Sequence, residues 1–170
     1  MRTFFIGDTH FGHGQVIGFE GRPFTDWQEM DEILIRKWND TVTDEDRVFM
    51  IGDFSFHGEE MTREICSKLR GHKILVKGNH DEGTEEFYRQ CGFESVYSFP
   101  IVLDGFWLIS HEPLYLNKNM PYANIYGHVH GNEMYKDVSQ HSFCACVERN
   151  DYAPVEWGEI KRKMAASPKP

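Results

Sequence analysis

The chain has 170 residues and a formal net charge of −9 at pH 7. At this length a single domain can bury roughly 70% of its unfolded surface and needs no disulfide bonds to fold. The acidic balance argues against stable binding of a nucleic-acid duplex, which depends on clustered Lys and Arg, and a small anionic substrate would be repelled unless its site supplied positive charge.

The first half of the chain alternates between strand and helix patterns. Apolar runs predict strands over residues 3–8, 47–52 and 73–78, and apolar residues at steps of three and four predict helices over 26–39 and 59–70. Thr25 or Asp26 is available as the N-cap of the first helix, and Gly71 would end the second. Residues 9–25 are expected to form a loop that lines the site. This order implies right-handed crossovers and a parallel sheet.

The second half shows a different pattern. A short helix is expected over 85–90, closed at Gly92, and strands over 96–103 and 106–110 flank the hairpin signal Asp104-Gly105. An antiparallel arrangement is expected to follow, with strands near 124–127 and 142–148. The predicted fold is an α/β domain over residues 1–160, in which two mixed sheets pack face to face with helices outside. Residues 161–170 are basic and predicted to be a flexible tail.

Polar residues follow five of the apolar runs at the point where each run ends. They are Asp8, Asp53, Asn79, His111 and His128. Because the carboxyl ends of parallel strands meet at one edge of a sheet, we expect these side chains to lie close together. His10 and His130 stand two residues after Asp8 and His128, so in extended chain each pair points to one side.

Seven oxygen and nitrogen ligands are too many for one tetrahedral ion, which uses about four. Two ions roughly 3.5 to 4 Å apart, sharing one carboxylate, would use them all. Two divalent ions against Asp8 and Asp53 leave a formal local charge of about +2. Such a site would attract phosphate despite the acidic chain.

These residues resemble the signature of the calcineurin-like metallophosphoesterases. The five blocks, in the family's order, are Asp8-x-His10, Gly52-Asp53, Gly78-Asn79-His80-Asp81, His111 and Gly127-His128-x-His130. The run 8–13, the later Arg22-Pro23-Phe24, and Val147-Glu148 with Tyr152-x-Pro154-Val155 look closest to small bacterial and phage-type phosphoesterases that lack a capping domain. The resemblance implies the family's four-layer α/β/β/α sandwich.

The resemblance also implies roles for individual residues. Asp8, His10 and His130 would hold one metal, Asn79, His111 and His128 the other, and Asp53 would bridge both. A hydroxide between the ions would attack phosphorus while His80 assists as general acid or as a donor to the phosphoryl group. Asp81 would orient the His80 imidazole, and Asn79 would also contact phosphate.

Further substrate contacts are predicted from position in the chain. His13 and His57 follow ligand blocks, and Arg22 follows the ligand-bearing loop, so all three are candidates for contact with substrate. Mn²⁺ is the expected metal, with Fe, Ni and Zn as alternatives, because ligands of this mixed type accept all of them. Cys144 and Cys146 are interpreted as packing residues rather than a metal pair.

The expected activity is hydrolysis of a small phosphodiester, such as a cyclic nucleotide or a similar compound, because a domain without a cap leaves its site open. One alternative is a phosphomonoesterase acting on a small phosphorylated metabolite. An alternative of another class is a catalytically inactive scaffold of the same fold, which would be expected to lose ligands or His80. Nuclease action in a larger complex is opposed by the acidic balance.

The chain is expected to be cytoplasmic. Its four cysteines form no Cys-x-x-Cys pair, and Gly7 and Asp8 interrupt the early apolar run that a signal peptide would need. No apolar stretch approaches the roughly 20 residues of a membrane span. We therefore expect a reduced protein without a membrane partner.

Overall fold

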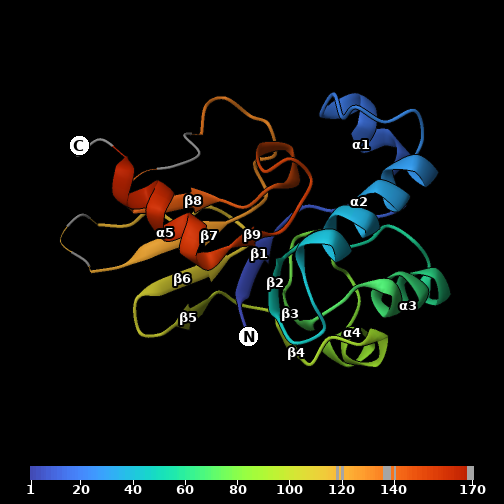
Figure 1. Ribbon diagram of the computed structural model, residues 1–170, viewed down its shortest axis with the longest axis horizontal. Coiled ribbons are helices and arrows are strands. Elements are labelled where there is room, and N and C mark those ends of the chain that lie inside the picture. Colours follow the sequence, from blue (N-terminus) through green and yellow to red (C-terminus); the bar gives the residue numbers. More distant parts are fainter. Residues whose placement is uncertain (118, 120, 136–138, 140, 168–170) are drawn as a thin grey trace.

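Two β-sheets lie face to face in the computed structural model, which describes residues 1–117, 119, 121–135, 139 and 141–167 (Figure 1). The first sheet has the order β4, β3, β2, β1, β9, with bounds Ser95–Tyr97, His72–Val76, Arg47–Ile51, Thr3–Ile6 and Val155–Glu156. The second has the order β5, β6, β7, β8, with bounds Ile101–Leu103, Trp107–Ser110, Ala123–Tyr126 and Ser142–Cys144.

Helices cover the pair of sheets. Their bounds are α1 Gly14–Phe19, α2 Trp27–Thr41, α3 Glu59–Lys68, α4 Glu85–Cys91 and α5 Trp157–Ala166, with a 3-10 turn over Val147–Arg149. Figure 1 shows α2, α3 and α4 on one side of the first sheet and the second sheet on its other side. α5 packs against β1, β8 and β9. The predicted α/β fold of two mixed sheets with flanking helices is confirmed.

The alternation of side chains along β1 explains how the first sheet buries both faces. Phe4 and Ile6 join the core under α2, α3 and α4, whereas Phe5 points the other way and joins the core between the sheets. The Phe5 ring stacks on that of Phe49, its register partner on β2, with centroids 5.2 Å apart. The interior of β1 is therefore apolar, and Asp8 comes only after the strand ends.

The stripe of apolar residues on α2 follows the predicted spacing. Met30, Leu34 and Trp38 are buried at steps of four, and the Asp26 carboxylate accepts a hydrogen bond from the Glu29 N–H as N-cap. Asp26 rather than Thr25 is therefore the cap. The predicted hairpin between β5 and β6 is also confirmed, and Asp104 and Gly105 both have the positive φ that such a turn needs.

The predicted antiparallel second half is wrong. β6, β7 and β8 run parallel, because residues 111–122 and 127–141 are long enough to carry the chain back to the same edge before each new strand. The run 96–103 is two strands, since Pro100 cannot donate to a ladder and the chain crosses there from the first sheet to the second.

Three other boundaries differ from the sequence prediction. The expected loop 9–25 contains α1, and the expected strand 142–148 ends at Cys144 before the 3-10 turn. Residues 161–166 of the predicted tail continue α5, because Ile160 and Met164 lie one helical turn apart and are both buried. The end of the predicted tail, residues 168–170, lies outside the described residues. Within the described ranges, no helix is both long and apolar enough to span a bilayer.

Candidate metal centre

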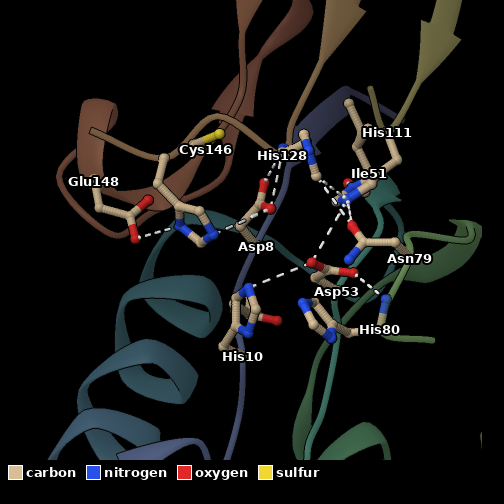
Figure 2. Close-up of polar contacts among 12 residues, drawn as sticks. Asp8, His10, Ile51, Asp53, Asn79, His80, His111, His128, Cys146 and Glu148 are labelled. Carbon is tan, nitrogen blue, oxygen red and sulfur yellow. Dashed lines mark hydrogen bonds and ion pairs between the residues drawn. The ribbon is translucent and has the colours of Figure 1, made fainter. Parts of the chain in front are cut away.

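The seven predicted ligands all follow strand ends and converge on one place. Asp8 and His10 come after β1, Asp53 after β2 and Asn79 after β3, while His111 follows β6 and the pair His128 and His130 follows β7. The carboxyl ends of three parallel strands of the first sheet thus meet those of two parallel strands of the second (Figure 2).

The ligands form two adjoining groups. Asp8, His10 and His130 offer atoms that lie within 4.8 Å of one another, and so do Asp53, His111 and His128. The Asn79 Oδ1 joins the second group, at 2.9 Å from the His111 Nε2 and 3.0 Å from the His128 Nδ1. The Asp53 Oδ2 lies 3.5 Å from the Nε2 of both His10 and His111. One oxygen of Asp53 therefore lies between the two groups.

The candidate ligand atoms suit a cation because ring nitrogens and oxygens with lone pairs face one another. The His111 Nδ1 lies 3.0 Å from the Ile51 carbonyl oxygen, which can only accept a hydrogen bond, so the neutral ring carries its proton on Nδ1. Its Nε2 then presents a lone pair toward the Asn79 oxygen. The His10 Nε2 is buried and has no hydrogen-bond partner among the described residues. The His111 Nε2 also lies 3.1 Å from the His128 Nδ1, so these nitrogen and oxygen atoms crowd round one point, and a metal ion bound there would satisfy the His10 Nε2 as well.

Backbone conformation aims the ligands. Five of the seven have left-handed φ values between 47° and 71°, which non-glycine residues adopt rarely and which cluster at functional sites; they are Asp8, His10, Asp53, His128 and His130. Glycines make room for these turns. A Cβ at Gly52 would collide with His111 and with the backbone of Gly78, and one at Gly127 would lie 2.5 Å from the Asp8 Oδ2. The strand ends therefore nest directly against one another.

Asp81 has a role other than the predicted one. Its buried carboxylate accepts hydrogen bonds from the N–H groups of Asp53 at 2.8 Å, Gly78 at 2.8 Å and Phe54 at 3.0 Å. Among the described contacts none joins it to the His80 ring, whose orientation it was expected to fix. Asp81 instead holds together the two turns that carry Asp53 and Asn79. Burial raises the pKa of this carboxyl group, and the three N–H donors oppose that rise.

His80 lies at the open side of the centre. Its backbone N–H donates to the Asp53 Oδ1 at 2.9 Å, which leaves the other carboxylate oxygen turned toward the ligand rings. The side chain is exposed, and its ring centroid lies 5.8 Å from that of His10 (Figure 2). The imidazole can therefore reach a group bound beside the ligands.

Arg22 is buried beneath the Asp8 turn. It is 4% exposed, and its Nη2 and Nη1 donate to the backbone oxygens of Asp8 and Thr9 at 2.7 and 2.9 Å. Its Nε and Nη2 also donate to the Glu148 carboxylate. All three guanidinium nitrogens are thus engaged by protein groups, and Arg22 positions the Asp8 turn instead of contacting substrate as predicted.

Glu148 is a site residue that the sequence did not reveal. Its Oε1 lies 2.9 Å from the His130 Nδ1 and 2.6 Å from the Arg22 Nη2. A carboxylate that accepts from one ring nitrogen fixes the other as the metal-facing atom. The resemblance pointed to Val147-Glu148 as a closing segment, but nothing in the local pattern links this glutamate to residues 18 and 126 positions earlier.

The other two predicted substrate contacts lie on the side of His10. The His13 ring stacks on Phe56 with centroids 3.9 Å apart, and its Nδ1 is 3.2 Å from the His10 Nδ1. The His57 Nε2 is 2.7 Å from the Asp31 carboxylate, while the same side chain lines a cavity beside the centre. The structure thus brings His13 to the ligands and His57 to the neighbouring cavity.

Burial controls the charges of the centre. It raises the pKa of Asp8 to about 6, although the nearby His111 and His130 act against the rise. Burial and neighbouring histidines lower the pKa values of His10 and His128 below the usual range, which keeps the rings neutral and able to bind metal. Burial also acts to lower the pKa of His130, but the hydrogen bond to Glu148 and the Asp8 carboxylate outweigh it and raise the value.

Two solved structures share the fold. A protein of unknown function from Aquifex aeolicus superposes with a TM-score of 0.72 and 28% sequence identity, covering 95% of this chain and 98% of that one. The nuclease MPE of Pseudomonas putida has a TM-score of 0.53 and 18% identity, covering 76% of this chain and 62% of that one. The second likeness shows a common fold alone.

Sequence comparisons give the family. An uncharacterized protein of Methanocaldococcus jannaschii is 30% identical over 168 residues, covering 91% of this chain and 86% of that protein. The gene 66 protein of Mycobacterium phage L5 is 32% identical over 82 residues, covering 46% of this chain and 39% of that protein. The family model described as calcineurin-like phosphoesterase matches residues 1–145, which include all seven candidate ligands. The chain belongs to the calcineurin-like phosphoesterase family.

Proposed function

We propose that this protein is a phosphoester hydrolase that uses two divalent metal ions and acts on a small phosphodiester. The observation that carries the proposal is the position of the Asp53 Oδ2, which lies 3.5 Å from one histidine of each ligand group. An isolated ion would need only one of these groups. A shared carboxylate between two groups is the ligand arrangement of two-metal hydrolases.

When bound, two divalent ions would supply positive charge for phosphate and lower the pKa of a coordinated water. The residues of the chain orient the ligands and supply a proton. Asp53 is oriented through both ends, because its N–H donates to Asp81 and its Oδ1 accepts from the His80 N–H. The exposed His80 imidazole is placed to give a proton to the departing ester oxygen, which is the role we assign to it.

The openness of the centre supports a diester substrate. Asn79, His80 and His128 are exposed, so phosphorus could carry two substituents without meeting a wall on this side. A phosphomonoester remains the second substrate class, and the experiment below separates the two. Mn²⁺ is the proposed metal, with Fe, Ni and Zn as alternatives, because imidazole, carboxylate and amide ligands suit all four.

We also propose that the protein works in the cytoplasm. Cys66, Cys91, Cys144 and Cys146 are free and buried, an arrangement that suits a reducing compartment. Fluorescence microscopy of a tagged chain, with fractionation as a second measurement, would test the location.

The experiment is hydrolysis by protein that has been freed of metal with a chelator and then reloaded. Bis-p-nitrophenyl phosphate and p-nitrophenyl phosphate are offered with Mn²⁺, Ni²⁺, Co²⁺, Fe²⁺ or Zn²⁺ in separate assays. We expect turnover only after metal is added, faster with the diester, and about two ions per chain by elemental analysis.

The outcomes separate the candidate functions. Faster turnover of the monoester would replace the diester with the phosphomonoester. Two bound ions with no turnover of either ester would favour an inactive scaffold of this fold, and failure to bind metal at all would overturn the proposal. His72→Ala, which alters a histidine on β3 paired with Glu94, serves as the control for loss of a histidine away from the centre.

A further inference from the structure

A cavity of about 560 Å³ opens beside the metal centre, between the residues after β2 and those after β3. His80 lines it, and so does Phe56, whose ring centroid lies 5.1 Å from that of His10 and 5.0 Å from that of His80. A group that leaves phosphorus on the His80 side therefore departs into this cavity. Its size falls within the roughly 300 to 1,000 Å³ of small-molecule sites.

The walls of this cavity suit a flat aromatic group. Phe56 is 41% exposed, and Phe87 and the largely buried Tyr88 also line the cavity. Exposed rings that face a cavity are stacking surfaces. The Ser55 hydroxyl, 3.0 Å from that of the buried Thr62, adds a polar atom to the lining.

The charges of this cavity disfavour an anion. Glu59 and Glu82 line it and are exposed, whereas none of the described lining residues is Lys or Arg. A leaving group with a second phosphate would place its charge near these carboxylates without a compensating cation. The cavity therefore accepts an uncharged group.

A second cavity on the other side of the centre is smaller. It has about 200 Å³ and is lined by Asn79, His111, Phe99 and Leu114 among others. This volume lies below the usual range for a drug-sized ligand. The two sides of the centre thus offer unequal room, and the larger substituent of a diester belongs on the His80 side.

We propose that the His80-side cavity binds the leaving group of the substrate, and that this group is an uncharged alcohol of nucleoside size that carries an aromatic ring. The inference rests on the proposed phosphoester hydrolase. In the reaction the oxygen of water bonds to phosphorus and the P–O bond to this alcohol breaks. One proton of the water ends on the departing oxygen and the other on the phosphate product or the solvent.

The first experiment measures binding without hydrolysis. Adenosine is titrated into metal-free protein, and amide shifts are followed by two-dimensional NMR. We expect saturable shifts in residues 55–62 and 80–88, which surround the cavity. Gly58 offers the blocking variant, because a Cβ there meets no atom within 4 Å and its φ of −63° suits any residue.

Gly58→Trp should weaken adenosine binding at least tenfold, and the matched control Gly58→Ser should stay within twofold of wild type. Serine at this helix N-cap preserves the start of α3 and adds little volume. With metal bound, Gly58→Trp should also lower kcat/KM for bis-p-nitrophenyl phosphate at least tenfold. Unfolding midpoints show whether each variant is folded.

The second experiment tests charge. With metal bound, methyl phenyl phosphate is compared with methyl 4-carboxyphenyl phosphate, which differ by one carboxylate on the leaving group. Glu82→Lys should raise kcat/KM for the carboxylated ester relative to the other at least threefold, with Glu82→Gln in between. An unchanged ratio would overturn the preference for an uncharged group.

Failure of the inference and failure of the proposed function give different results. If the metal-loaded protein hydrolyses both nitrophenyl esters but adenosine does not saturate, or binds Gly58→Trp as well as wild type, the cavity assignment is wrong and the hydrolase stands. If adenosine binds and Gly58→Trp blocks it while no ester is hydrolysed, the binding site stands and the proposed function falls.

Discussion

Two buried aspartates, one at the metal centre and one at the start of β2, are treated in opposite ways by the fold. Asp46 is 2% exposed and accepts five hydrogen bonds, three from Arg2 and two from Thr43. Asp8 is 0% exposed and, within the described part of the chain, accepts from a single N–H, that of His128. The fold gives the first carboxylate many protein donors and the second few, as we propose for a metal ligand.

The pKa values of the two carboxyl groups follow this difference in hydrogen bonding. Hydrogen bonds from Arg2 hold the pKa of Asp46 below its usual range, whereas burial raises that of Asp8 to about 6. Changes at the centre should therefore affect activity and metal binding, and changes at Asp46 should affect stability alone. The predictions below test this division, beginning with the largest expected effect.

His80→Ala should lower kcat about 10²-fold to 10⁴-fold, because it removes the proposed proton donor. Metal content should not change, since the described contacts of His80 with a ligand run through its backbone N–H, which alanine retains. Steady-state kinetics and elemental analysis are the measurements, and His72→Ala is the control. Loss of bound metal in His80→Ala would assign its imidazole to the ligand set instead.

Asp8→Asn should make the metal-free protein more stable at pH 7 while abolishing tight metal binding. Wild-type Asp8 keeps its proton in the folded state up to pH about 6 but releases it near 3.8 when unfolded. Stability therefore falls as pH rises from about 4 to about 6, and the difference corresponds to about 3 kcal/mol. The variant lacks this group and should lose that part of the pH dependence.

Denaturant unfolding of metal-free wild type and Asp8→Asn at pH 4, 5, 6 and 7 checks this prediction. The two curves should diverge with rising pH, and adding Mn²⁺ should stabilise the wild type alone. Parallel curves across this range would show that the folded protein does not retain the proton on Asp8.

Asp46→Asn should lower the unfolding midpoint by about 3 °C or more without changing kcat per folded molecule. Solvent screens part of the interaction because the Arg2 side chain is 48% exposed, so this effect should be smaller than that at Asp8. The stabilisation is present above the usual pKa of an aspartate and is lost as pH falls below it. Calorimetry checks the prediction, with the exposed Asp44→Asn as the matched control.

Glu148→Gln should weaken binding of one metal ion about tenfold, because it weakens the hydrogen bond that fixes His130. The other ion, held by the group that contains Asn79 and His111, should bind as before. Isothermal titration calorimetry of metal-free protein with Mn²⁺ shows whether the affinity falls at one site or equally at both. Equal weakening of both sites would mean that Glu148 acts on the whole centre.

The convergence of the candidate ligands was predictable from the sequence, but the contacts that hold them in place were not. Asp8, Asp53 and Asn79 stand directly after apolar runs, and that local pattern marks a strand end without any knowledge of which strands pair. The contact between Arg22 and Glu148 joins residues 126 positions apart, and no periodicity reports it. Asp81 was assigned to the wrong partner because its carboxylate accepts from the backbone N–H groups of Asp53 and Phe54, and sequence adjacency to His80 does not report those contacts.

Strand direction also shows that local sequence patterns do not report long-range contacts. The turn Asp104-Gly105 encodes a hairpin locally, and that prediction was correct. The pairing of β6, β7 and β8 depends on where long connections lead the chain, and it was predicted with the wrong direction.

The nested glycines at the rim have a consequence for anyone who wishes to redesign this protein. The turn after β2 fills the space that a side chain at Gly78 would occupy, and the Asp8 carboxylate does the same at Gly127. These turns therefore cannot be transplanted one at a time, because each one packs directly against a neighbouring turn. An engineer who wants this chemistry in another scaffold must carry over the whole rim as one part.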